Sequence, residues 1–153
     1  MPSQITCSNM PSLDGVLLTS LKIIPDERGQ VMHILRADAP HFTAFGEVYV
    51  SSVYGHTLKA WKLHTSCAAN IAVPHGRVKF VLHDKRLDSP THSQTQVVFL
   101  GENTYQLLHI PPGVAYGWKN LLSETAYIIN CATEPHRPDE GKLLAPQDIP
   151  YEW

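Results

Sequence analysis

Two short stretches of the chain carry side chains that could act together on a bound molecule, and the first contains Lys62 and His64. These residues are two positions apart within residues 58–64, and on a β-strand residues with that spacing point to the same face. An ammonium and an imidazole on the inner face of a strand are costly unless they have partners or a function. We therefore interpret this face as one wall of a pocket. The alternative is a hydrogen-bonded polar pair inside the protein that takes no part in catalysis.

The second stretch covers residues 110–120 and opens with Pro111-Pro112-Gly113. Proline and glycine in this order are typical of a tight turn. The turn is expected to present Tyr116 from a loop, where a ligand-binding role and a packing role are equally supported. We interpret this stretch as the opposite wall of the same pocket.

The elements that must position these walls are short β-strands. Runs of β-branched, aromatic or alternating residues, separated by turns about every ten residues, predict about nine strands. A sandwich or barrel is the architecture that such a pattern favours. We expect a single domain over residues 1–153, with residues 1–13 loosely held and residues 134–153 forming an extended strap. The expected strands cover residues 15–24, 30–36, 47–54, 58–64, 69–73, 77–84, 95–100, 104–110 and 125–132.

Composition excludes several classes of partner. The formal net charge of −2 provides no basic field for nucleic acid or for an anionic membrane. No apolar run approaches the ~20 residues that span a bilayer, and we expect no signal peptide. The cysteines Cys7, Cys67 and Cys131 are too few and too scattered for a disulfide framework or a zinc site. Because these cysteines do not form a disulfide framework, we expect the protein to work in a reducing, cytoplasmic setting.

Both stretches resemble the two motifs of the cupins, which are double-stranded β jelly rolls. Lys62 and His64 stand where the first motif has a His-x-His pair, and Ala69 stands near its acidic position. Of the four metal ligands that cupins use, only His64 remains, and one histidine beside an ammonium does not hold a divalent metal. The resemblance therefore implies an all-β jelly roll without a metal. The second motif, Pro-x-Gly-x-x-His-x-x-x-Asn, is matched by Pro111, Gly113, Tyr116 and Asn120, with Tyr116 in the histidine position.

A closer resemblance, over most of the chain, is to the dTDP-4-dehydrorhamnose 3,5-epimerase family and its sugar-epimerase-like relatives. It implies no cofactor, a nucleotide-sugar substrate and a homodimer whose early strands pair across the interface. Cell-surface glycan or deoxysugar biosynthesis would be the setting. The motifs that carry it, in family order, are Asp26-Glu27-Arg28-Gly29, Leu63-His64, Asp88-Ser89-Pro90-Thr91, the turn leading to Tyr116, Ser123-Glu124-Thr125-Ala126 and Asp148-Ile149-Pro150-Tyr151-Glu152-Trp153.

The family's chemistry is proton abstraction next to the ketone of a 4-keto-6-deoxy sugar nucleotide. The resemblance gives His64 the role of base, and burial beside Lys62 favours the neutral imidazole that a base needs. Lys62 could hydrogen-bond the enolate oxygen. In the family a tyrosine on the opposite side of the sugar returns the proton, and Tyr127 and Tyr116 are the candidates here.

Several positions depart from the family pattern. The family tyrosine position aligns with Ile129, two residues after Tyr127 and on the same face. The aspartate that orients the histidine aligns near Ala145-Pro146, where Asp148 could substitute after a register shift. With both altered, a single epimerisation, a related ketoisomerisation or another enolate-type reaction is favoured over a double epimerisation.

Phosphate contacts are also reduced, because family arginine and lysine positions are occupied by Trp61, Ala69 and Ala72. Trp61 lies on the face opposite His64, together with Lys59, and is expected to pack. The residues left as candidates for substrate binding are Arg28, Lys59, Lys79 and Asn120.

Two other functions stay open from the sequence. One is a non-catalytic cupin that binds a sugar nucleotide or a small carbohydrate. The other is a metal-dependent cupin that takes its missing ligands from other histidines such as His75 or His109.

Overall fold

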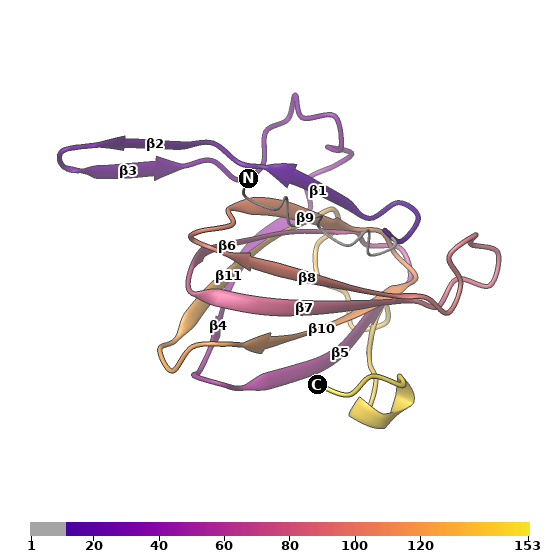
Figure 1. Ribbon diagram of the computed structural model, residues 1–153. Helices are drawn as coiled ribbons and strands as arrows, with labels where there is room; N and C mark the ends of the chain where they lie inside the picture. Colours follow the sequence, from indigo (N-terminus) through magenta and orange to yellow (C-terminus); the bar gives the residue numbers. More distant parts are fainter. Residues whose placement is uncertain (1–11) are drawn as a thin grey trace, which may run out of the picture.

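Two five-stranded antiparallel sheets pack face to face in the structure, a computed structural model that describes residues 12–153 (Figure 1). The first sheet has the order β1-β9-β6-β11-β4, the second has the order β12-β5-β10-β7-β8, and β2 and β3 form a separate hairpin. This is the all-β sandwich that the cupin resemblance implies. The strands are β1 (Leu17–Ser20), β2 (Ile23–Asp26), β3 (Gly29–Met32), β4 (Glu47–Val53), β5 (Leu58–His64), β6 (Ala69–His75), β7 (Arg77–Asp84), β8 (Thr95–Gly101), β9 (Gln106–Ile110), β10 (Val114–Asn120), β11 (Ala126–Ala132) and β12 (Gly141–Leu143).

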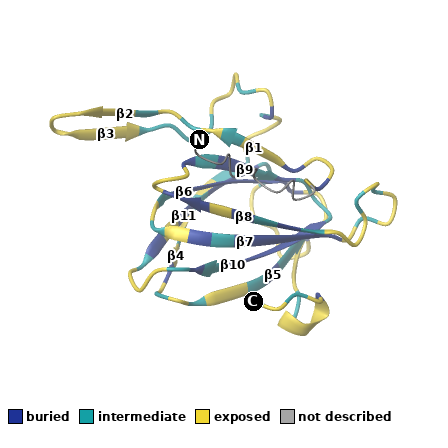
Figure 2. Cartoon of the chain, in the orientation of Figure 1, coloured by how far each residue is buried: buried dark blue, intermediate teal, exposed yellow. Residues whose placement is uncertain are grey.

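The early strands differ from the expected pattern. Residues 15–24, predicted as one strand, form β1 and the start of β2. The N–H of Leu21 bonds to the Tyr105 carbonyl at the end of the β1–β9 ladder, and the chain then leaves the sheet. Strand β2 pairs with β3, and this hairpin projects from the sandwich (Figure 1) and is largely exposed (Figure 2).

The turn after Ile110 leads into a strand rather than a loop. Gly113 adopts φ +87°, which glycine tolerates, and Val114 then pairs at once with Asp84 of β7. The resulting strand β10 lies between β5 and β7. Tyr116 is therefore held in the middle of a sheet and is 2% exposed.

The core lies between the two sheets, because alternate residues of each strand point inward. Its largest side chains come from β7 and β10 on one side, including Phe80, Leu82 and Trp118. They meet side chains such as Leu108 and Ile128 of the opposing sheet. Burying a side chain of this size contributes about 1.5–3 kcal/mol to folding.

Strand β5 contains a local irregularity that changes which way Lys59 points. Tyr116 pairs with Lys62, but Trp118 pairs with Lys59, so β5 has one more residue than β10 over this span. An extra residue reverses the alternation of side chains. Lys59 and Lys62 therefore lie on the same side, and the expectation that Lys59 shares a face with Trp61 is wrong.

The C-terminal segment, expected as an extended strap, wraps the outer face of the second sheet. It adds β12 to β5 and a short 3₁₀ helix, η1 (Pro146–Asp148). Ile149, Tyr151 and Trp153 then pack on Trp61, which is 1% exposed. Trp61 thus packs on the face opposite His64, as expected, and it donates from Nε1 to the Pro146 carbonyl at 3.2 Å.

The structure also bears on the N-terminal segment, the cysteines and the expected lack of a membrane span. Residues 1–11, most of the segment expected to be loosely held, and Cys7 lie outside the described residues. Leu13 is not loosely held, because it is 1% exposed and its N–H donates to Gln96 Oε1 at 2.9 Å. Cys67 and Cys131 are free and buried. Within residues 12–153 the structure contains no helix long and apolar enough to cross a membrane.

Candidate active site

A cavity of about 470 Å³ opens between the two sheets, where β4 and β11 face β5 and β12. Polar side chains from both sheets line it. Lys62 and His64 share its wall on β5, as the alternation within residues 58–64 predicted. The polar lining includes Tyr49, Lys62, His64, Asn130 and Glu140.

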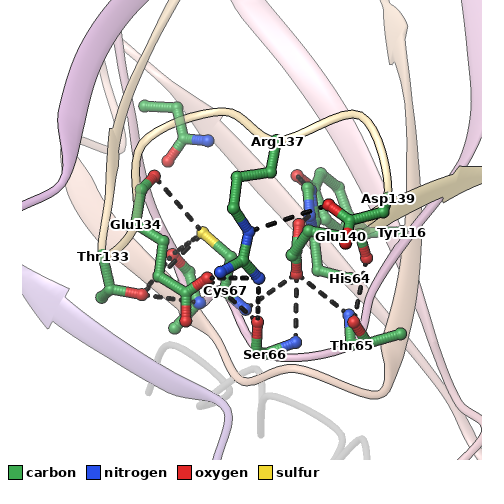
Figure 3. Close-up of polar contacts among 12 residues, drawn as sticks. His64, Thr65, Ser66, Cys67, Tyr116, Thr133, Glu134, Arg137, Asp139 and Glu140 are labelled. Atoms are coloured by element: carbon green, nitrogen blue, oxygen red, sulfur yellow. Dashed lines mark hydrogen bonds and ion pairs between the residues drawn. The ribbon is translucent and has the colours of Figure 1, made fainter.

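The most constrained pair in the cavity is His64 and Glu140. Glu140 Oε2 lies 2.6 Å from Nδ1 of His64 (Figure 3). The other carboxylate oxygen, Oε1, accepts three backbone N–H groups, from Thr65 and Ser66 at 3.0 Å and from Cys67 at 2.8 Å. The Glu140 side chain is 6% exposed. A buried carboxylate with every oxygen occupied holds the imidazole in one orientation.

The charge state of Glu140 follows from this geometry. Burial raises the pKa of Glu140, but the hydrogen bonds from His64 and from the Cys67 and Ser66 N–H groups outweigh burial and lower it to about 2. The side chain is therefore a carboxylate at neutral pH and can only accept. The hydrogen between the two side chains belongs to His64 Nδ1, which leaves Nε2 as the nitrogen with a free lone pair.

Glu140 reaches His64 through strand pairing. In the β5–β12 ladder Gly141 lies opposite His64, so the residue before Gly141 falls beside the imidazole. A Cβ on Gly141 would be 3.3 Å from ring atoms of His64, and glycine therefore lets β12 approach the ring. Glu140 could not be singled out from the sequence, because the tail carries several acidic residues and only the pairing of β12 with β5 places one of them beside His64.

The acid expected to orient His64 has another role. Asp148 Oδ2 accepts the Ala145 N–H at 2.8 Å at the start of η1. Asp148 does not line the cavity. The expectation that it orients the histidine is wrong, because the chain between β12 and η1 carries it to the outer face.

Tyr116 lies next to His64 rather than across the cavity from it. Its hydroxyl lies 3.5 Å from Nε2 of His64, and the two rings stack with centroids 6.2 Å apart. Full burial raises the pKa of Tyr116, so the side chain is a neutral phenol. At 3.5 Å the contact is at the limit of a hydrogen bond and is therefore weak.

Lys62 supplies a cation to the same cavity. Its Nζ lies 5.4 Å from the ring centroid of Trp118 and 5.9 Å from that of Tyr49. Burial, followed by repulsion from Lys59, lowers the pKa of Lys62. Over the described part of the chain no carboxylate pairs with this ammonium, which therefore remains free to bind a negative oxygen of a ligand.

Tyr127 does not reach the cavity. Along β11 the side chains of Ala126, Ile128 and Asn130 point inward, and Tyr127 points outward with Ile129. Tyr127 is 45% exposed and packs against His75 with ring centroids 5.8 Å apart. The expectation that Tyr127 could donate a proton in the pocket is wrong, because strand alternation turns it to solvent. Asn130 takes the inward place.

Two candidate substrate-binding residues are occupied elsewhere. Lys79 lies on the outer face, with Nζ 5.0 Å from the Tyr151 ring and 5.7 Å from the Trp153 ring. Asn120 is fully buried, and its amide donates to the carbonyls of Val53, Tyr54 and Glu124. Asn120 holds two turns together and does not line the cavity. The expectation that Lys79 and Asn120 bind substrate in this cavity is therefore wrong.

The other two candidates lie at different distances from the site. Lys59 borders a hollow shared with Lys62 and Ser51, and its Nζ donates to the Ser52 carbonyl at 3.1 Å. Arg28 lies in the turn of the projecting β2–β3 hairpin, 81% exposed in its side chain and bound to Asp26 at 2.7 Å. No contact between Arg28 and the cavity is made within one chain.

The donor set does not suit a metal ion. Among residues 12–153 no group of three or more His, Cys, Asp or Glu side chains is arranged to hold one. His75 pairs with Glu102 at 3.0 Å, and His109 bonds to Asn70 at 2.7 Å. Neither histidine lines the cavity, so the expectation that they complete a metal site is wrong.

Comparisons with known proteins agree with this architecture. Residues 11–153 match the sequence model of the family described as dTDP-4-dehydrorhamnose 3,5-epimerase. The chain is 33% identical over 146 residues to the spore coat polysaccharide biosynthesis protein SpsL of Bacillus subtilis, covering 92% of this chain and 96% of that protein. It is 30% identical over 139 residues to the probable low-salt glycan biosynthesis epimerase Agl13 of Haloferax volcanii, covering 88% and 89%.

Solved structures share the fold. The crystal structure of a dTDP sugar isomerase from Desulfovibrio desulfuricans G20 superposes with a TM-score of 0.88 at 43% identity, covering 92% of each chain. ChmJ, a 3'-monoepimerase from Streptomyces bikiniensis solved with dTDP-quinovose, has a TM-score of 0.83 at 17% identity, covering 94% of this chain and 77% of that one. The second likeness concerns the fold alone.

Proposed function

The chain belongs to the dTDP-4-dehydrorhamnose 3,5-epimerase family, and we propose that it inverts a carbon next to the ketone of a nucleotide-linked 4-keto-6-deoxy sugar. The observation that carries the proposal is the His64–Glu140 pair beside Lys62 in one cavity. The names of the SpsL and Agl13 relatives support a role in the biosynthesis of a cell-surface polysaccharide or glycan. The name of the Desulfovibrio relative supports a thymidine nucleotide on the sugar.

The proposed chemistry begins with proton transfer to His64. Nε2 takes the proton from the carbon next to the ketone. The C–H electron pair forms a C=C bond, and the C=O π pair moves to the oxygen to give an enolate. Glu140 stabilises the imidazolium that forms, because its carboxylate faces Nδ1. The Lys62 ammonium stabilises the enolate oxygen, and its partial burial makes that interaction stronger than it would be in bulk water.

Solvent exchange tests this proposal directly. The protein would be incubated in heavy water with a panel of nucleotide-linked 4-keto-6-deoxy sugars, and deuterium at each sugar carbon would be followed by NMR. We expect deuterium at C3, C5 or both with the wild type, and its loss in His64→Asn. Tyr127→Phe, on the outer face, is the matched control and should exchange normally. Saturable binding without exchange for every sugar would contradict the enzyme and favour a binding module.

We also propose that two chains form a homodimer through the early strands. The hairpin and the edge strand β4 expose apolar side chains that water would otherwise surround, including Ile24, Val31, Val48 and Val50. Light scattering after size exclusion should give twice the chain mass of 17.1 kDa. Val31→Glu should shift the mass toward the monomer, and a wild type that is monomeric at high concentration would contradict the proposal.

A cytoplasmic location is proposed with the same function. The free thiols of Cys67 and Cys131 support a reducing compartment. Fractionation of cells that express the tagged chain should place the activity in the cytosolic fraction, and activity confined to the exterior would contradict this location.

A further inference from the structure

We propose that Tyr49 is the proton donor that faces His64 across the cavity, an inference that rests on the proposed epimerase function. Tyr49 belongs to β4 of the first sheet and His64 to β5 of the second, and both side chains line the same cavity. Inversion requires a base on one face of the sugar and a donor on the other. Residues on opposing sheets meet that requirement.

The other tyrosines do not meet it. Tyr116 is in contact with His64 Nε2 at 3.5 Å and is 2% exposed, so a sugar ring does not fit between the two. Tyr54 and Tyr127 are exposed, Tyr105 donates to the His33 carbonyl, and Tyr151 packs on the outer face. Within residues 12–153 Tyr49 is therefore the tyrosine placed to face the base across a bound sugar.

The hydrogen bonds around Tyr49 leave its hydroxyl hydrogen free. The Asn70 N–H donates to Asn130 Oδ1 at 3.1 Å, which fixes the orientation of the Asn130 amide. Asn130 Nδ2 must then donate to the Tyr49 oxygen, 2.9 Å away. Because that oxygen accepts, the phenol's own hydrogen can be donated into the cavity. Asn130 and Asn70 are 5% and 1% exposed, so this arrangement is rigid.

The protonation state suits a donor. Burial raises the pKa of Tyr49, and the hydrogen bond from Asn130 opposes that rise. Tyr49 is thus a phenol at neutral pH. The same N–H donor stabilises the phenolate that remains after the proton has left. The Lys62 ammonium, 5.9 Å from the Tyr49 ring centroid, favours that negative charge as well.

The step balances as a proton transfer. His64 has taken the original hydrogen and the enolate holds the electron pair. A lone pair of the enolate oxygen re-forms the C=O bond, and the C=C π pair takes the proton of the Tyr49 O–H on the opposite face. An imidazolium and a phenolate are left, and water returns a proton to Tyr49 and removes one from His64.

The ratio of epimerisation to solvent exchange tests this role. In Tyr49→Phe we expect epimer formation to fall about 100-fold or more. Deuterium should still enter at the same carbon with retained configuration, because His64 can remove the hydrogen and return a deuteron to the same face. Tyr127→Phe should keep the wild-type ratio. Thermal unfolding would confirm that each variant is folded.

Asn130→Asp provides a second variant of nearly the same shape. One carboxylate oxygen can still accept the Asn70 N–H, but the other would accept the Tyr49 hydrogen and turn it away from the substrate. We expect the ratio to fall in the same direction as in Tyr49→Phe. Normal epimerisation by Tyr49→Phe, or a parallel loss of exchange and epimerisation with an unchanged ratio, would overturn the role of Tyr49. A wild type that shows no exchange with any sugar would overturn the proposed function itself, and this inference with it.

Discussion

Glu140 holds His64 from behind, with Oε2 2.6 Å from Nδ1, while its other oxygen is bound by three consecutive backbone N–H groups. A carboxylate held in this way has one orientation and one charge state. It assigns the imidazole hydrogen to Nδ1, and it compensates the positive charge that appears when Nε2 takes up a proton. The ability of His64 to accept a proton at Nε2 therefore depends on its contact with Glu140.

Glu140→Gln should therefore remove most of the activity without removing the hydrogen bond. The Gln oxygen would keep the three N–H partners, and its amide would then donate to Nδ1, which moves the ring hydrogen to Nε2. His64 would then have a hydrogen on Nε2 and no lone pair facing the substrate. Solvent exchange of the substrate hydrogens should therefore be about 10³–10⁴-fold slower. Nitrogen NMR of His64 would show the tautomer, and a variant with normal exchange and unchanged tautomer would contradict the prediction.

Stability in acid should depend on the same carboxylate. The folded pKa of Glu140 is lowered from 4.5 to about 2, so its stabilising contribution is full above about pH 4.5 and is lost as the pH falls toward 2. The contribution is on the order of 3 kcal/mol. Urea unfolding of wild type and Glu140→Gln should differ most near neutral pH and converge near pH 2. A difference that does not change with pH would rule out the charge as its cause.

A second buried carboxylate offers a comparison far from the cavity. Asp84 is fully buried, and its hydrogen bonds to Arg86, Ser89 and Thr91 lower its pKa against the opposing effect of burial. Asp84→Asn should destabilise the fold by about 3–5 kcal/mol, because Arg86 would be left unpaired. The variant should exchange substrate normally at temperatures where it is folded. Loss of exchange in fully folded protein would link this cluster to the site.

Lys62→Met should separate activity from stability. We expect solvent exchange to slow about 10²–10³-fold because the enolate oxygen loses its cation. The folded pKa of Lys62 is lowered, so its charge costs stability below that pKa, and the cost disappears as the pH rises toward the unfolded value. The melting temperature at pH 7 should accordingly stay the same or rise. A clear fall would show that the ammonium has a stabilising partner.

The C-terminal cover over Trp61 should be a major source of stability. Trp61 is 1% exposed beneath Ile149, Tyr151 and Trp153, so Trp61→Ala should cost about 3–5 kcal/mol in denaturant unfolding. Leu87→Ala, at a residue that is 88% exposed, is the surface control and should change stability by less than about 0.5 kcal/mol. Equal effects would contradict the packing role of the tail.

Much of this architecture could be predicted from local patterns. Strands β5 and β7 begin and end at the predicted residues, because their alternation and the turns around them are local signals. The shared face of Lys62 and His64 follows from the same rule. The rule failed for Lys59, because the extra residue in β5 is visible only from its pairing with β10.

The amino-acid pattern was enough to predict the all-β class, the strand face that carries Lys62 and His64, and the family to which the chain belongs. The distant residues that meet that face could be identified only from the folded structure. The register of β12 on β5 places Glu140 beside His64. The packing of one sheet on the other brings Tyr49 and Asn130 to face that strand. The alternation of side chains along β11 turns Tyr127 outward. These are contacts between residues far apart in the chain. Their geometry is set by strand register and sheet packing, which a single strand's pattern does not encode.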